Sequence, residues 1–208
     1  MVKSVSGEDH LKKSTFLVAV SAMFWLATAA YGQQMDFAFG LSTTHSAPAS
    51  TTSTSAFPPV SLTGGIYPSI SGDFLIKKSL GVGGEISWRG GQANYDFSQP
   101  YRPIFWDFDG IYTPKLGPHV AAEFSAGIGA ESTRFYTNYV TCSFVSCTNY
   151  ATSTHFMGQF GAGLKLYARG GLFVRPEVHL YVVNNNFEYT SPYVVRYGAS
   201  IGYTFGGR

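Results

Sequence analysis

Charged side chains are scarce in this sequence. Only 12% of its 208 residues are Asp, Glu, Lys or Arg, about half the share found in an average soluble domain. A soluble domain with so little charge would have difficulty covering its surface with polar groups. The formal net charge of +2 also gives no electrostatic reason to expect nucleic acid as a partner.

Long apolar runs are also missing after the N-terminus. A helical membrane protein would show runs of about 20 apolar residues, and only the segment before residue 32 comes close to this length. The remainder alternates between apolar and polar residues and is rich in aromatics (16%) and in glycine (24 residues). This mixture favours a protein that keeps its polar groups inside and exposes apolar groups to lipid.

Catalytic and ligand-binding motifs are absent as well. The sequence contains no G-x-S-x-G elbow, and its five histidines do not have metal-ligand spacing. Gly127-Ile128-Gly129-Ala130 resembles the start of a dinucleotide fingerprint but lacks the third glycine and lies in a strand pattern. We therefore expect no catalytic residue, no metal and no cofactor.

The N-terminus has the order of a secretory signal peptide. Lys12 and Lys13 precede an apolar run from Phe16 to Ala30, and small residues follow up to Gly32. We expect residues 1–32 to be a cleaved signal peptide and residues 33–208 to form the mature domain. A retained membrane anchor is the alternative, for which the run is short.

The mature chain alternates with the two-residue period of β-strands, which place successive side chains on opposite faces. In the first segment, for example, Met35, Phe37, Phe39 and Leu41 share one face. Segments of this kind lie near 35–42, 62–74, 80–89, 106–112, 122–131, 156–166, 174–182 and 195–205. We expect Pro68, which cannot donate to a ladder, to cause a bulge or a bend in the second segment.

The connections between these segments alternate in length. The loops near 43–59, 90–104, 136–153 and 184–192 are long, whereas the turns at 77–79, 114–118 and 169–171 are short. Outer-membrane barrels have short periplasmic turns and long external loops. The pattern predicts an all-β fold, an eight-stranded antiparallel up-and-down transmembrane β-barrel with its long loops outside the cell. A soluble β-sandwich is the alternative.

Charged residues at strand positions fall almost entirely on the polar face, which would line the lumen. Since buried charges must be paired, we expect a luminal charge network of Glu85, Arg89, Glu123, Glu131, Lys165, Arg175, Glu177, His179 and Arg196. Asp36, Asp73, Asp107 and Asp109 lie on the same face. A packed polar interior is the preferred interpretation, because eight-stranded barrels have little free space inside. A narrow ion path is the alternative.

Two further groups of residues fit a barrel in an exported protein. Trp88, Trp106, Tyr112, Tyr203 and Phe205 lie near strand ends, where interfacial aromatic girdles occur. Cys142 and Cys147 are the only cysteines and lie in a polar stretch. In an oxidising compartment we expect them to form a disulfide that closes a small loop, with two free thiols as the alternative.

One enzymatic alternative rests on His179. Some outer-membrane lipases and lipid A deacylases carry a Ser/His/acid set on the barrel wall, and Ser200 on the last segment could lie near His179. The deacylase pattern of a His followed two residues later by Ser is absent, because position 181 is Tyr. We therefore expect a luminal His179 paired with Glu177.

The strand at 81–86 (Gly-Val-Gly-Gly-Glu-Ile) and the closing segment from Arg196 to Phe205 resemble the small OmpA/OmpX-like outer-membrane β-barrel domains of Gram-negative bacteria. The resemblance covers most of 33–208, and a final strand ending in Phe resembles the signal read by the barrel-assembly machinery, although Gly206-Gly207-Arg208 follow it here.

We expect a monomer in the outer membrane, and the resemblance implies a structural or cell-surface interaction role, which we expect to act through the external loops. The expected partners are outer-membrane lipid and lipopolysaccharide, together with the barrel-assembly machinery and periplasmic chaperones during biogenesis. An external ligand remains unnamed. The functional alternatives are a porin-like narrow channel and a lipid A-modifying enzyme.

Overall fold

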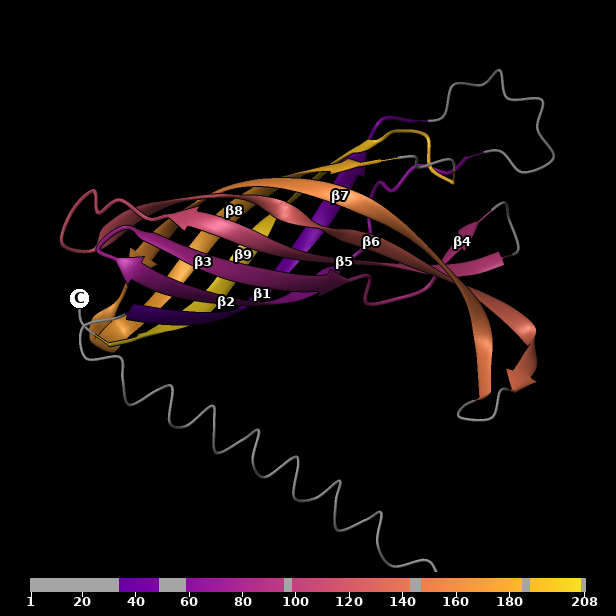
Figure 1. Ribbon diagram of the computed structural model, residues 1–208, viewed down its shortest axis with the longest axis horizontal. Coiled ribbons are helices and arrows are strands. Elements are labelled where there is room, and N and C mark those ends of the chain that lie inside the picture. The colour runs from indigo at the N-terminus through magenta and orange to yellow at the C-terminus, as the bar shows by residue number, and fades with distance from the viewer. Residues whose placement is uncertain (1–33, 49–58, 96–98, 143–146, 185–187, 207–208) are drawn as a thin grey trace, which may run out of the picture.

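The strands form one antiparallel sheet that closes on itself (Figure 1). The computed structural model describes residues 34–48, 59–95, 99–142, 147–184 and 188–206. Neighbouring strands pair in chain order, and β1 closes the barrel by pairing with β9, with Met35 opposite Phe205. The eight barrel strands are β1 (Gln34–Ser46), β2 (Tyr67–Lys77), β3 (Leu80–Trp88), β5 (Gln99–Tyr112), β6 (Val120–Cys142), β7 (Cys147–Tyr167), β8 (Leu172–Val183) and β9 (Tyr193–Phe205). The expected eight-stranded antiparallel barrel is confirmed.

The barrel has a short-turn end and a long-connection end, on the left and right of Figure 1. The turns at 77–79, 113–119 and 168–171 lie at the short-turn end, as the sequence predicted. In the last of these turns Gly170 and Gly171 have φ angles of 77° and 94°. This left-handed conformation strains any residue with a Cβ atom, which explains the Gly-Gly pair.

The outer wall of the barrel is apolar. Strand residues at alternate positions point away from the lumen, as in Phe39, Phe108, Ile128 and Ile201, whose exposed fractions range from 59% to 69%. Their neighbours along each strand point inward and are largely polar, as the alternation predicted. No helix among the residues that the structure describes is long and apolar enough to cross a membrane.

The second strand differs from its prediction. We expected it to begin at Leu62, but β2 begins at Tyr67, and Leu62 is fully buried outside any strand. The expected irregularity at Pro68 is also wrong. Pro68 pairs with Leu41, and β2 begins its pairing with β3 one residue later, at Ser69. At the start of the strand Pro68 has no ladder bond to donate, and the register shift lies between Leu75 and Lys77 instead.

Three of the expected loops contain strand residues. β1 (Gln34–Ser46) takes up the first four residues of the expected loop 43–59. The segment 90–104 holds a short ninth strand, β4 (Ala93–Tyr95), which pairs with the beginning of β5. The segment 136–153 continues β6 and β7 as a two-stranded ribbon that extends beyond the barrel (Figure 1). Residues 49–58 of the expected first loop and the expected signal peptide lie outside the described residues.

Candidate functional site

The middle of the lumen contains a network of paired charges. Lys165 on β7 is fully buried, and its Nζ atom lies 2.6 Å from Asp36 Oδ2 on β1 and 3.0 Å from Asp73 Oδ2 on β2. It also contacts a carboxylate oxygen of Glu123 on β6. Lys165 therefore connects strands on opposite sides of the barrel.

Arg175 on β8 extends the network toward the long-connection end. Its Nη1 atom lies 2.5 Å from Glu123 Oε1, and its Nε donates to Glu177 Oε2 at 2.6 Å. The remaining guanidinium nitrogen, Nη2, donates to Ser71 Oγ at 3.0 Å. Every nitrogen of this guanidinium has a partner, which offsets much of the cost of burying a charge.

The next layer contains Arg196, Glu85 and His179. Arg196 on β9 contacts Glu85 on β3, and its guanidinium carbon lies 5.6 Å from the centre of the Tyr181 ring. His179 lies between Glu85 and Glu177, with Nε2 3.8 Å from Glu85 Oε2 and 3.9 Å from Glu177 Oε1. His179 and Glu177 thus lie within ion-pair distance in the lumen, as expected, although both distances are too long for hydrogen bonds.

Carboxyl groups outnumber permanent cations in the described part of the interior. The buried cations are Lys165, Arg175 and Arg196. The buried acids of the barrel strands are Asp36, Asp73, Glu85, Asp107, Asp109, Glu123, Glu131 and Glu177. Asp107 and Asp109 on β5 each have a buried oxygen with no hydrogen-bond partner among the described residues. Some of the buried carboxyl groups therefore lack a cationic partner among the described residues.

Two residues of the expected network lie apart from it. Glu131 is fully buried nearer the long-connection end, where it accepts a hydrogen bond from Thr133. Arg89 follows β3 at the same end and packs against Gly65, where a Cβ atom would lie 2.8 Å from its guanidinium carbon. Alternation alone assigned both residues to the polar face and gave no information on their depth in the barrel.

An apolar plug fills the lumen toward the long-connection end, and the sequence analysis missed it. The rings of Phe105 and Tyr181 stack across the lumen, with centroids 4.9 Å apart and an interplanar angle of 6°. The plug consists of Leu62, Tyr67, Tyr101, Phe105, Met157, Tyr181, Val183, Tyr189 and Val194. Phe105 and Met157 share the inward face with Asp107 and Gln159. The two-residue alternation along β5 and β7 could therefore have indicated that both apolar side chains point into the lumen.

Tyr189 joins the plug from the connection between β8 and β9. Its hydroxyl contacts Thr133 Oγ1, and burial raises its pKa well above the ordinary value for tyrosine. Next to it, His155 Nε2 lies 2.7 Å from Glu188 Oε2. Val60 and Tyr189 form an isolated bridge, so two long connections meet over this end of the lumen.

The free space inside the charged layer is small. A cavity of about 20 Å³ borders Ser71, Asp73, Glu85, Asp109, Glu123 and His179. This volume is about that of a single water molecule. Together with the aromatic plug, this packing favours the expected packed interior over the alternative of a narrow ion path.

The arrangement around Ser200 does not provide a nucleophile and its base. Ser200 Oγ lies 3.1 Å from Arg175 Nε and 3.2 Å from Glu177 Oε2. His179 Nδ1 instead lies 2.8 Å from Gln159 Nε2. In the β8–β9 register Ser200 lies opposite Arg175, whereas His179 lies opposite Arg196, so the two residues are in different layers.

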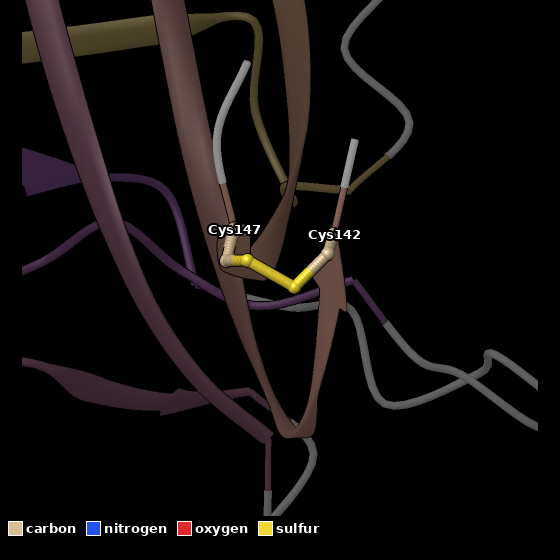
Figure 2. The surroundings of a disulfide bond; sticks show 2 residues. All are labelled: Cys142 and Cys147. Carbon is tan, nitrogen blue, oxygen red and sulfur yellow. A yellow bond between two sulfur atoms is a disulfide. The ribbon is translucent and has the colours of Figure 1, made fainter. Parts of the chain in front are cut away.

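At the long-connection end β6 and β7 continue as a ribbon, which we define as residues 136–142 and 147–156. A disulfide joins Cys142 to Cys147 near its tip, as Figure 2 shows and as the sequence predicted. Tyr139 and Val140 are 69% and 64% exposed. Pairing with β5 stops at Phe135 and pairing with β8 stops at Met157. At the base of the ribbon, Gln99 Nε2 donates to the Tyr136 carbonyl and the Asn184 amide donates to the Phe156 carbonyl.

Two arginines lie on the outer wall at the base of the ribbon. Arg102 on β5 and Arg134 on β6 are directly opposite in the register, and they lie beyond the apolar pair Trp106 and Ala130 on the same face. Arg134 stacks on Tyr150 with 4.8 Å between guanidinium carbon and ring centre. Like charges directly opposite in a sheet repel each other, so this pair concentrates positive charge at one place on the outer wall.

The five expected interfacial aromatics all lie on the outward face. Trp88 and Trp106 are toward the long-connection end, because Trp88 ends β3 and Trp106 pairs with Ile86. Tyr112, Tyr203 and Phe205 lie at the short-turn end, and the rings of Tyr203 and Phe205 are 4.7 Å apart. The two groups occupy opposite rims of the apolar wall.

Comparison with solved structures identifies proteins with a similar fold. No protein family matches the sequence, and no curated protein matches it. Among solved structures, Ail, the attachment invasion locus protein of Yersinia pestis in complex with the heparin analogue sucrose octasulfate, matches with a TM-score of 0.55 at 10% identity. This match covers 84% of this chain and 99% of Ail. Neisserial surface protein A matches with a TM-score of 0.59 at 11% identity, covering 84% and 97% of the two chains.

The N-terminal β-barrel domain of Pseudomonas aeruginosa OprF matches with a TM-score of 0.52 at 14% identity, covering 84% of this chain and 98% of that domain. At these identities the likeness concerns the fold. The chain has the small eight-stranded barrel fold of the OmpA/OmpX-like kind, which confirms the resemblance that its sequence suggested.

Proposed function

We propose that this protein is an outer-membrane β-barrel of a Gram-negative bacterium that has a structural and surface-interaction role through its external ribbon and loops. The observation that carries the proposal is the combination of an apolar outer wall with a filled interior and a protruding ribbon. Because the interior is occupied by paired charges and aromatic rings, the surfaces available to a partner lie at the long-connection end.

The orientation follows from the same features. Outer-membrane barrels keep short turns in the periplasm and long loops outside. In the proposed orientation the turn at 77–79 faces the periplasm, and the ribbon with its disulfide lies outside the cell. Residues 1–32 would serve as the cleaved signal peptide. The barrel-assembly machinery and periplasmic chaperones would act on residues 33–208, and the closed β1–β9 seam is consistent with a monomer.

Lipopolysaccharide is the lipid partner that we propose for the outer wall. Arg102 and Arg134 lie just beyond the apolar wall at the proposed external side, where the phosphate groups of the outer leaflet are found. A phosphate between the two guanidinium groups would relieve their repulsion and accept hydrogen bonds from both. The cation–π contact with Tyr150 holds Arg134 in place for this contact.

The experiment that tests the interaction role compares adhesion of cells that display three forms of the protein. We expect cells with the wild type to bind an epithelial monolayer, and the bound fraction to fall at least several-fold when residues 137–149 are replaced by Asn-Gly between Tyr136 and Tyr150. The matched control is Lys78→Ala in an exposed short turn, which should adhere like the wild type. Equal adhesion of all three forms, at equal surface levels, would overturn the proposal.

A porin-like channel and a lipid A-modifying enzyme are the alternatives. The stacked Phe105 and Tyr181 rings argue against an open path, and the separation of Ser200 from His179 argues against a nucleophile–base pair. Mass spectrometry of lipid A from cells with and without the protein tests the enzymatic alternative directly. An unchanged lipid A is the result that our proposal expects.

A further inference from the structure

We propose that Glu85, Glu177 and His179 form a binding site for a divalent transition-metal ion, with zinc as the preferred occupant, inside the barrel. One ligand atom from each of these three residues lies within 4.8 Å of the others. The proposal goes beyond the surface role above, and it does not depend on that role.

The first argument is the unsatisfied imidazole nitrogen. His179 is only 7% exposed, and its Nε2 atom has no hydrogen-bond partner among the described residues. The two nearest carboxylate oxygens lie at 3.8 and 3.9 Å, beyond the range of hydrogen bonds. A cation shared by the three groups would satisfy the nitrogen and both oxygens together.

The second argument is the fit of the distances. Zinc bonds of ~2.0–2.2 Å to nitrogen and oxygen at tetrahedral angles place neighbouring ligands roughly 3.3 Å apart. The His179–carboxylate separations of 3.8 and 3.9 Å need to shorten by only about half an ångström to reach this value. The three ligand atoms lie within 4.8 Å of one another, so binding would also bring the two carboxylate oxygens closer together.

The third argument is that each of the three ligands is oriented by a second residue. Arg196 contacts Glu85 Oε1 and Arg175 contacts Glu177 Oε2, so the oxygens left over, Glu85 Oε2 and Glu177 Oε1, are those that face His179. Gln159 lies 2.8 Å from His179 Nδ1. With its amide oxygen turned toward Nδ1, Gln159 would accept the Nδ1 proton and leave Nε2 free to bind metal.

The fourth argument combines charge and space. The described interior has more buried carboxyl groups than permanent cations, as shown above, so a divalent ion reduces the imbalance. The cavity of about 20 Å³ borders both Glu85 and His179 and has room for one water molecule. Three protein ligands and one water make the four-coordinate site that zinc prefers.

The bound ion would link β3 to β8. These two strands are separated by β2, β1 and β9 around the wall, so the ion would join opposite sides of the lumen. Since a ligand that binds only the folded state stabilises it, we expect zinc to raise the denaturant concentration needed to unfold the barrel.

The test uses the full mature barrel, folded in detergent micelles and mixed with one equivalent of zinc chloride. The sample is passed over a desalting column, and the metal that stays with the protein is measured by mass spectrometry. We expect about one zinc per wild-type chain and at least a tenfold loss in His179→Gln. The matched control, His155→Gln, alters a histidine near the long-connection end and should retain zinc. Heat-modifiable gel migration reports whether each variant is folded. Glu85→Gln is a second variant that removes a proposed zinc ligand.

Three results would overturn the site. Wild-type protein without retained zinc contradicts it, and so does equal zinc in the wild type and in folded His179→Gln, which would show adventitious binding only. Cobalt provides an independent readout, because its visible absorption changes when an imidazole nitrogen enters the coordination shell. Retention of magnesium or calcium with no zinc or cobalt would also contradict a site that includes His179.

Discussion

The ammonium group of Lys165 lies 2.6 Å from the carboxylate of Asp36, although 129 positions separate the two residues in the sequence. Lys165 is on β7 and Asp36 is on β1, and β8 and β9 lie between them along the wall. Contacts of this kind connect distant strands through the lumen, so loss of one partner would leave the other as an unpaired buried charge.

Replacement of Lys165 by methionine should therefore destabilise the barrel strongly. The substitution leaves Asp36, Asp73 and Glu123 facing one another in a buried layer without their shared cation. Removing one partner of a buried ion pair costs about 3–5 kcal/mol. The measurement is the urea midpoint of unfolding in lipid vesicles. Lys78→Met, at an exposed turn residue, is the control and should stay within about 0.5 kcal/mol of wild type; an equal effect of both substitutions would contradict the network.

A valine at Gly202 should also destabilise the protein, whereas a valine at Gly72 should be tolerated. A Cβ atom at the inward-facing Gly202 would lie 2.7 Å from the Phe37 carbonyl oxygen and would overlap the Phe173 ring. At the outward-facing Gly72 the nearest atom is 3.9 Å away. Overpacking in a filled interior costs about 1–3 kcal/mol. The folded fraction of each variant in heat-modifiable electrophoresis measures the difference, and similar behaviour of the two would argue against a filled lumen.

Truncation of the aromatic plug should open a path that the wild type lacks. Phe105 and Tyr181 are both almost fully buried and stack face to face. The double variant Phe105→Ala/Tyr181→Ala removes both rings, and we expect single-channel conductance in planar bilayers to rise from near the baseline to a measurable level. The matched control is Phe108→Ala/Phe160→Ala on the outer wall, which should remain closed. A conducting wild type would support the channel alternative instead.

Loss of the disulfide should affect the ribbon and leave the barrel intact. In the chain-entropy model, closing so short a loop is worth roughly 2 kcal/mol, and this stabilisation is confined to a ribbon outside the barrel wall. For Cys142→Ser/Cys147→Ser we expect faster amide hydrogen exchange at Tyr139 and Val140, together with an unchanged urea midpoint. A large drop in the midpoint would mean that the ribbon and the barrel unfold as one unit.

The sequence was sufficient to predict the architecture because its dominant signal is local. Alternation such as Met35, Phe37, Phe39 and Leu41 depends only on which side of a strand faces the apolar surroundings and which faces the polar lumen. Turn residues such as Gly170 are set by their own backbone angles. The disulfide was predictable for the same reason, since Cys142 and Cys147 are neighbours in the sequence.

The interior could not be predicted to the same depth. Strand parity places Lys165, Glu131 and Phe105 on one face, but depth in the barrel depends on the stagger between strands, which the sequence does not state. The ribbon was taken for a loop because its Ser, Thr, Asn and Tyr residues have no apolar face. Its two strands pair with each other beyond the wall, where no alternation of apolar and polar residues is required.

The most direct test of the central claim is labelling of single cysteines on intact Gram-negative cells with a membrane-impermeant maleimide, in the Cys142→Ser/Cys147→Ser background. Asn138→Cys lies in the ribbon, and Lys78→Cys lies in a short turn at the other end of the barrel. We predict that Asn138→Cys is labelled on intact cells, and that Lys78→Cys is labelled only after the outer membrane is permeabilised. Labelling of Lys78→Cys on intact cells, or of neither site before lysis, would contradict an outer-membrane barrel with its ribbon outside the cell.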